Sequence, residues 1–176
     1  MPEILAKPII RLFVYGTLRQ GQRLAFYMQD SKFEGMYYAQ GQLMKARNGS
    51  IYIDRRAQNV ATIGELHYVS FYCLQRINHL EALSGEFPQG YELYVMPVWK
   101  LTNRNEYDFD PQKAVLSFYY RRRNTPVKIL TGDYSTDFDP VIELKDFLLR
   151  NSYQEISSED IIQYMYNKMS IWEFEF

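Results

Sequence analysis

Histidine and cysteine, the usual ligands of zinc and frequent catalytic residues, are scarce in this 176-residue sequence. There are two histidines, His67 and His79, and one cysteine, Cys73. Neither histidine has an evident partner for a zinc site, which takes several His, Cys or carboxylate ligands. The sequence also lacks a Gly-x-Ser-x-Gly elbow, a phosphate-binding P-loop and a Gly-x-Gly-x-x-Gly turn. We therefore expect no metal and no cofactor, and a carboxylate or a tyrosine as the acid–base group.

Glu81 is the strongest candidate among the carboxylates because of its position in a predicted helix over residues 71–83. It follows Ile77 by four residues and Leu74 by seven, which places it along the edge of the apolar stripe of the helix. Apolar neighbours disfavour the charged form of a carboxylate and so suit it to proton transfer near neutral pH. The alternative is that Glu81 only closes the helix and pairs with an arginine.

Two other glutamates lie close to Glu81 in the sequence. Glu86 follows Gly85 in a predicted turn, and Glu92 alternates outward from Tyr91 in a predicted strand. Both positions favour exposure to solvent. Spacing alone leaves the structural and the catalytic interpretation of Glu81 open.

The second candidate element is the turn formed by Tyr15, Gly16, Thr17 and Leu18. It follows residues 9–14, a near-continuous apolar run that predicts a strand buried on both faces. A glycine turn at the end of such a strand frees successive backbone N–H groups, which can bind a carboxylate or an oxyanion. The alternative is a plain strand end in which Gly16 serves only its backbone angles.

The elements that must position these residues are mostly strands. Alternating, β-rich segments predict strands, Ser70 is a plausible N-cap for the helix over 71–83, and two further helices close the chain. Mixed strands with few helices predict an α+β barrel or curved sheet with a C-terminal helical extension, divided as 1–140 and 141–176. The predicted strands cover 9–14, 41–46, 50–53, 60–68, 91–101 and 114–121, and the predicted terminal helices cover 141–150 and 158–168.

The amino-acid composition limits the kinds of partner that we expect the protein to bind. Twenty Lys and Arg balance twenty-one Asp and Glu, so the strong attraction of a basic protein to nucleic acid is absent. The basic run at 121–123 is then a solvated strand end. No segment approaches the ~20 apolar residues that span a bilayer, and we expect no membrane partner. A single cysteine and the lack of an apolar signal segment predict a cytoplasmic protein.

Several short motifs in order resemble those of the γ-glutamylcyclotransferase-like family. The opening Val-Tyr-Gly-Thr-Leu-Arg-Gln-Gly and its Thr-Leu step look most like the branch of γ-glutamylamine cyclotransferases and plant defence-induced proteins. Each motif has modest specificity, but their order and spacing seldom arise by chance. The resemblance covers roughly residues 11–135, and its segments are 14–21, Gly35, 41–43, 63–66, 77–81, Tyr91, 117–120 and 130–134.

The resemblance implies a small mixed β-barrel and an enzyme that needs no cofactor. Its substrate would be a small γ-glutamyl compound, whose α-amine attacks its own γ-carbonyl to give 5-oxoproline and a free amine. Glu81 would be the acid–base residue, and the backbone of residues 15–18 would hold the glutamyl group. Tyr91 and Tyr120 would be walls of the pocket. The oligomeric state is not predicted.

Three departures from the family pattern keep a second function class open. Asn78 replaces an aspartate, Leu93 replaces an arginine, and Arg23-Leu24 replaces an asparagine region. The alternative is an inactive scaffold that acts as a binding module, with an aromatic strand at Trp172, Phe174 and Phe176 added to the sheet edge of a partner. We prefer a tail that packs on its own domain, and an active enzyme.

Overall fold

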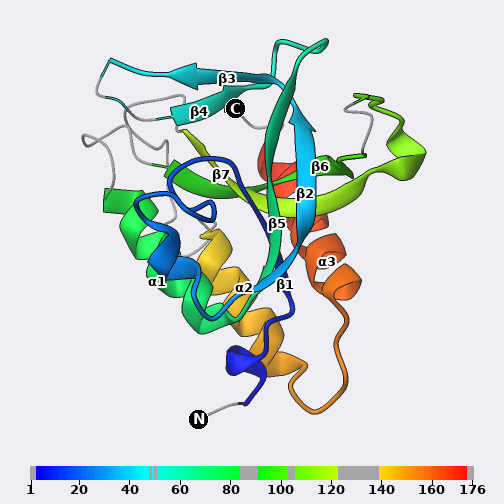
Figure 1. The fold of residues 1–176 in the computed structure, drawn as a ribbon. Coiled ribbons are helices and arrows are strands. Elements are labelled where there is room, and N and C mark those ends of the chain that lie inside the picture. Colours follow the sequence, from blue (N-terminus) through cyan, green and yellow to red (C-terminus); the bar gives the residue numbers. More distant parts are fainter. Residues whose placement is uncertain are drawn as a thin grey trace, which may run out of the picture.

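Five strands of the computed structural model close into a small barrel (Figure 1). They are β1 (Ile10–Val14), β2 (Lys32–Gln40), β5 (Ala61–Val69), β6 (Tyr91–Lys100) and β7 (Val115–Arg122). Around the barrel the order is β1, β5, β2, β6, β7. The pair of β1 with β7 is parallel and the other four pairs are antiparallel. The structure describes residues 3–47, 49, 51–83, 91–102, 106–122 and 139–173, and gives the backbone alone for 81–83, 122 and 170–173.

The remaining elements surround this barrel. Strands β3 (Gln42–Lys45) and β4 (Ile51–Asp54) form a separate two-stranded sheet. These elements confirm the predicted α+β class, a small mixed β-barrel with a few helices and a helical C-terminal part. The helices are α1 (Phe71–Leu83), α2 (Pro140–Arg150) and α3 (Ser158–Glu173), with short 3-10 helices η1 (Glu3–Ala6), η2 (Ala25–Met28) and η3 (Pro111–Lys113).

Strand β1 is the buried centre of the sheet, as its apolar run predicts. All five of its residues are buried, because β5 pairs with one edge and β7 with the other. Gly64 of β5 lets the two strands approach closely: a Cβ there would lie 2.5 Å from the Phe13 ring and from the carbonyl oxygen of Val14. The end of β1 is thus held against β5.

Helix α1 begins and ends where the sequence predicts. The side chain of Ser70 accepts a hydrogen bond from the backbone N–H of Cys73 at 3.1 Å, which caps the first turn. Cys73, Leu74 and Ile77 are fully buried, so this face of α1 packs into the core. The helix also contacts η2, which lies beside it in Figure 1.

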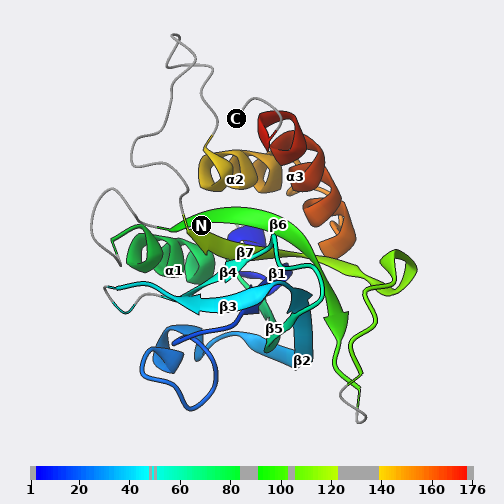
Figure 2. The same ribbon diagram turned by 90° about the horizontal axis from the view of Figure 1, so that it is seen from above.

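Helices α2 and α3 pack on the barrel rather than stand apart from it. Asp139 caps α2 by accepting from the backbone N–H groups of Val141 and Ile142. Figure 2 shows both helices on one side of the barrel, opposite the connection from β1 to β2. Residues such as Leu144 and Ile162 belong to the same core as the strands. The division at residue 140 stays a prediction.

The end of the chain differs from the aromatic strand that the alternative interpretation requires. Helix α3 runs five residues further than predicted, to Glu173, so the backbone of Trp172 is helical. Phe174 and Phe176 lie outside the described residues. Trp172, the first residue of the alternating aromatic pattern, therefore continues a helix and does not begin a strand.

Candidate active site

The turn after β1 offers three backbone N–H groups in a row. We call residues 15–20 the cradle turn. Within the described part of the chain, the N–H groups of Gly16, Thr17 and Leu18 have no acceptor, whereas that of Arg19 donates to Gly16 O at 3.1 Å. The carbonyl of Thr17 accepts from the N–H of Leu24 at 2.9 Å, which closes the loop. Successive free amides of this kind bind anions.

The backbone angles of Gly16 do not explain why this position is a glycine. Its φ is not positive, so its conformation does not require glycine. A Cβ built at Gly16 would meet no atom within 4 Å, so packing against the described residues does not require glycine either. A side chain at Gly16 would enter space that the described residues leave open.

A chain of hydrogen bonds joins the cradle turn to α1. The Tyr15 hydroxyl donates to the backbone carbonyl of Tyr120 on β7 at 2.6 Å. The Tyr120 hydroxyl donates in turn to Oδ1 of Asn78 on α1 at 3.3 Å. Three of the residues that the sequence singles out thus lie together, although they come from three elements. Asn78 fills the position of the missing aspartate and still serves as an acceptor.

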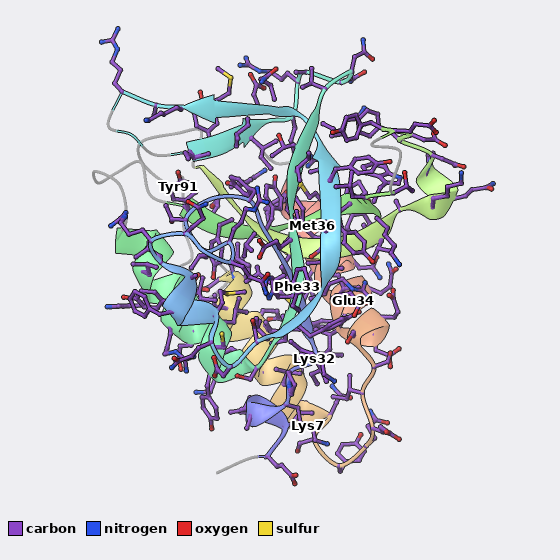
Figure 3. The ribbon with its side chains drawn as sticks, in the orientation of Figure 1. Lys7, Lys32, Phe33, Glu34, Met36 and Tyr91 are labelled. Carbon is purple, nitrogen blue, oxygen red and sulfur yellow. The ribbon has the colours of Figure 1, made fainter. Side chains whose placement is uncertain are left out.

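Tyr91 lies on the same face of the β6–β7 pair as Tyr120. In the register of the two strands Tyr120 is opposite Leu93, and Tyr91 is two residues before Leu93, so the two tyrosines are diagonal neighbours. The Tyr91 hydroxyl donates to the carbonyl of Ile51 on β4 at 2.5 Å. Figure 3 shows Tyr91 between the β3–β4 sheet and the C-terminal part of α1. Tyr91 therefore ties this small sheet to the barrel.

Glu81 lies in the last turn of α1, three residues after Asn78. Positions three apart share a face of a helix, so the backbone of Glu81 belongs to the face that Tyr120 contacts. The side chain of Glu81 is outside the described part of the chain, as is all of Glu86. Glu92 accepts a hydrogen bond from Nε of Arg121 at 3.1 Å, so a cation already neutralises it.

The structure adds a buried carboxylate that the sequence analysis assigned no role. Glu65 on β5 is 3% exposed. The backbone N–H of Gln20 lies 3.0 and 3.1 Å from its two carboxylate oxygens, and Nε of Arg19 lies 3.4 Å away. Glu65 thus binds the far end of the cradle turn. Its spacing of two from His67 in a strand, which puts both on one face, was the signal available in the sequence.

His67 continues this buried polar chain. Its Nε2 lies 3.0 Å from Oε1 of Glu65, and its Nδ1 lies 2.9 Å from Oγ of Ser31. Ser31 donates to the carbonyl of Met28 at 2.6 Å. The ring of Phe33, labelled on β2 in Figure 3, contacts the imidazole with centroids 5.4 Å apart. Polar groups buried in this way are satisfied by one another.

A hollow of about 230 Å³ lies beside the cradle turn. Leu18 and Gln20 of the turn line it, together with His67 and Ser31 from the buried chain. Part of the cradle turn therefore faces open space instead of packed side chains. Side-chain packing does not fix this part of the turn, so its conformation depends on hydrogen bonds.

Cysteine chemistry and metal binding find little support in the described residues. Burial raises the pKa of the Cys73 thiol to about 12, so the reactive thiolate is disfavoured. The described residues hold no group of three or more His, Cys, Asp or Glu side chains that could share a metal ion. Within the same residues, no helix is both long and apolar enough to span a membrane.

The closed five-stranded barrel and its turn of free backbone amides define a class of small mixed-barrel protein. A family model described as "Gamma-glutamyl cyclotransferase, AIG2-like" matches residues 12–136. Since this is most of the 176 residues, the chain belongs to that family, as its motifs predict. The motif at 130–134 lies outside the described residues.

The solved structure of a mouse protein has the same fold. An AIG2-like protein from Mus musculus has a TM-score of 0.52 and 21% identity, over 75% of this chain and 89% of that chain. An uncharacterized protein from Pyrococcus horikoshii has a TM-score of 0.43 and 22% identity, over 78% and 96%. A search of curated proteins finds no match.

Proposed function

We propose that this protein is a γ-glutamylcyclotransferase. It converts a γ-glutamyl group to 5-oxoproline and releases an amine or an amino acid, with no cofactor. The observation that carries the proposal is the row of three free amides at Gly16, Thr17 and Leu18, linked through Tyr15 and Tyr120 to the helix of Glu81. Family membership supports a cyclotransferase in general, and these contacts favour a built anion site in this chain.

In the proposed mechanism the cradle turn binds the α-carboxylate of the substrate and holds its glutamyl chain bent. The α-nitrogen then attacks the γ-carbonyl, forming a C–N bond as the bond to the leaving nitrogen breaks. The α-ammonium loses two protons, the first before its nitrogen attacks; Glu81 passes both in turn to the leaving nitrogen, which departs as an ammonium. Because both reacting groups belong to one molecule, holding the bent conformer supplies much of the acceleration.

Tyr91 and Tyr120 are the proposed walls of the pocket. Both hydroxyls are engaged, with Ile51 O and with Asn78, so the rings are fixed and would present apolar edges to the substrate. We expect the reaction to occur in the cytoplasm and to involve neither nucleic acid nor membrane.

The test is to incubate the purified protein separately with γ-glutamyl-lysine, γ-glutamyl-alanine and glutathione, and to measure 5-oxoproline by mass spectrometry. We expect at least one substrate to give 5-oxoproline and its amine in equal amounts. If a folded sample, checked by circular dichroism, forms none from any of the three, the proposal is wrong and the inactive binding scaffold is favoured.

A further inference from the structure

Glu65 is the only described side chain that binds the backbone of the cradle turn at Gln20. A carboxylate that is 3% exposed is costly to bury unless its oxygens are well supplied with donors. The donors here are the Gln20 amide, the Arg19 guanidinium and the His67 ring. Two of the three belong to the cradle turn itself, so the buried charge and the shape of the turn depend on each other.

We propose that Glu65 is a positioning residue, which fixes the cradle turn through the Gln20 amide so that the amides of Gly16, Thr17 and Leu18 stay available to the substrate. His67 and Ser31 hold Glu65 from the other side. The inference rests on the proposed function, because it assigns the turn its task in substrate binding. Glu65 touches no reacting atom in this scheme.

This buried network of hydrogen bonds has a fixed direction. It runs from the Met28 carbonyl through Ser31 and His67 to Glu65, with three links of 2.6, 2.9 and 3.0 Å. The Ser31 hydroxyl has one proton, which it donates to the Met28 carbonyl. The link between Ser31 and His67 therefore takes its proton from Nδ1 of the ring.

The same polarity argues against a nucleophilic serine. Ser31, His67 and Glu65 are the residue types of a hydrolytic triad, in which the serine proton must point to the histidine. Here the Ser31 proton goes to Met28 O, and Nδ1 of His67 donates to the serine oxygen. The chain is therefore arranged to hold a carboxylate, and not to activate a hydroxyl.

The hollow beside the cradle turn should confine the effect of losing Glu65 to that turn. Because Leu18 and Gln20 line open space of about 230 Å³, the turn can relax into it when its anchor is lost. Removing the Glu65 carboxylate should then displace the turn while the barrel strands stay paired. Glutamine at this position keeps one acceptor oxygen for the Gln20 amide but loses the second oxygen and the negative charge beside Arg19, so it should rescue part of the loss.

The experiment compares Glu65→Ala and Glu65→Gln with the wild type, with Glu155→Ala as a surface control. Hydrogen exchange followed by mass spectrometry reports on residues 15–24 without substrate. We expect protection of that segment to fall about tenfold or more in Glu65→Ala, less in Glu65→Gln, and β7 to be unchanged. Kinetics should show a KM raised by a similar factor, with the pH dependence of kcat kept.

Three outcomes separate the ideas. If the wild type forms no 5-oxoproline but Glu65→Ala loses protection in the turn, the proposed function fails and the positioning role stands. If Glu65→Ala and Glu155→Ala match the wild type in both exchange and KM, the positioning role is wrong. Covalent labelling of wild-type Ser31 by a fluorophosphonate, absent in Ser31→Ala, would also overturn it, because it would show an activated serine.

Discussion

The hydroxyl of Tyr15 donates a hydrogen bond of 2.6 Å to the backbone carbonyl of Tyr120. This bond joins the cradle turn to β7, whose Tyr120 side chain in turn contacts α1. The cradle turn and β7, which are far apart in the sequence, are therefore held in a fixed arrangement at the candidate site.

Tyr15→Phe removes this link and leaves the ring in place. We expect the free energy of unfolding to fall by about 1 kcal/mol and KM to rise, because the turn loses one anchor. Urea unfolding and steady-state kinetics measure the two effects. Tyr153→Phe is the control, since Tyr153 is 83% exposed. Equal behaviour of the two variants would show that the bond does not matter to the site.

Gly16→Ala and Gly64→Ala should behave in opposite ways. A Cβ at Gly16 meets nothing within 4 Å, whereas one at Gly64 lies 2.5 Å from Phe13 and from Val14 O. We expect Gly16→Ala to keep its stability and lose substrate binding, because the methyl group occupies the space beside the free amides. Gly64→Ala should lose about 1–3 kcal/mol of stability through overpacking.

Thermal unfolding and KM distinguish these two variants. A stable Gly16→Ala with an unchanged KM would mean that the substrate does not lie against the cradle turn. A stable Gly64→Ala would mean that β1 and β5 can separate without cost.

Glu81→Gln should lower kcat by roughly 10²- to 10⁴-fold, the usual contribution of a general acid–base residue, and leave the fold intact. Glu92→Gln makes the same change on a glutamate that already pairs with Arg121, and should keep most of the activity. Stopped assays of 5-oxoproline with matched circular dichroism spectra measure both. Loss of activity in Glu92→Gln but not in Glu81→Gln would show that Glu92, and not Glu81, is the acid–base residue.

Local patterns were enough to predict the elements whose cause is local. The helix over 71–83 has its cap at Ser70 and its apolar period within a few residues, and α1 has the same bounds. Strand β2 is different: its pattern includes exposed charged residues, and only the motif resemblance at Gly35 indicated a strand there. Its place follows from pairing with β5 and β6, which local sequence does not encode.

The residues of the candidate site also divide into those with a local cause in the sequence and those without one. Tyr15, Gly16, Thr17 and Leu18 could be found because a buried strand ends in glycine. The role of Glu65 could not, because spacing places it only on one strand face with His67, whereas its partners in the cradle turn lie 45 or 46 residues away and Ser31 lies 36 residues from His67. A carboxylate in a strand gains its role only when the barrel brings the turn to it.

Glu159→Ala should cost more stability than the loss of an exposed ion pair. Its carboxylate accepts from Arg11 at 2.6 Å, and Arg11 is buried on β1, so the variant leaves a buried guanidinium without its acid. Because the Glu159 side chain is itself 70% exposed, we expect a loss of about 2 kcal/mol, less than the roughly 3–5 kcal/mol of a fully buried pair. Asp108→Ala, which breaks the exposed pair with Lys113, should cost under about 1 kcal/mol.

Urea unfolding in low and high salt tests this comparison, because salt screens the Asp108–Lys113 pair, exposed at both ends, more than a pair whose guanidinium is buried. Equal losses in Glu159→Ala and Asp108→Ala would show that Arg11 does not depend on α3. In that case α3 would be held to the barrel by its apolar residues alone.

Cys73 gives a pH-dependent prediction. Burial raises its pKa from 9.0 to about 12, so the unfolded chain releases the thiol proton first as pH rises. Between these two values the unfolded state binds fewer protons, and the stability contributed by the neutral thiol is lost. Below 9.0 that contribution is fully present. Cys73→Ala should therefore show a smaller loss of stability with rising pH across this window.

Thiol labelling checks the same burial directly. The Cys73 thiol is fully buried and donates to the carbonyl of Tyr27 at 3.5 Å, so a disulfide reagent at about pH 8.5 should react slowly with the native protein. In urea the reaction should be fast, because the unfolded thiol has its ordinary pKa. Rapid labelling of the native protein would mean that α1 opens often enough to expose its core face, and the slope of stability with pH should then match that of Cys73→Ala.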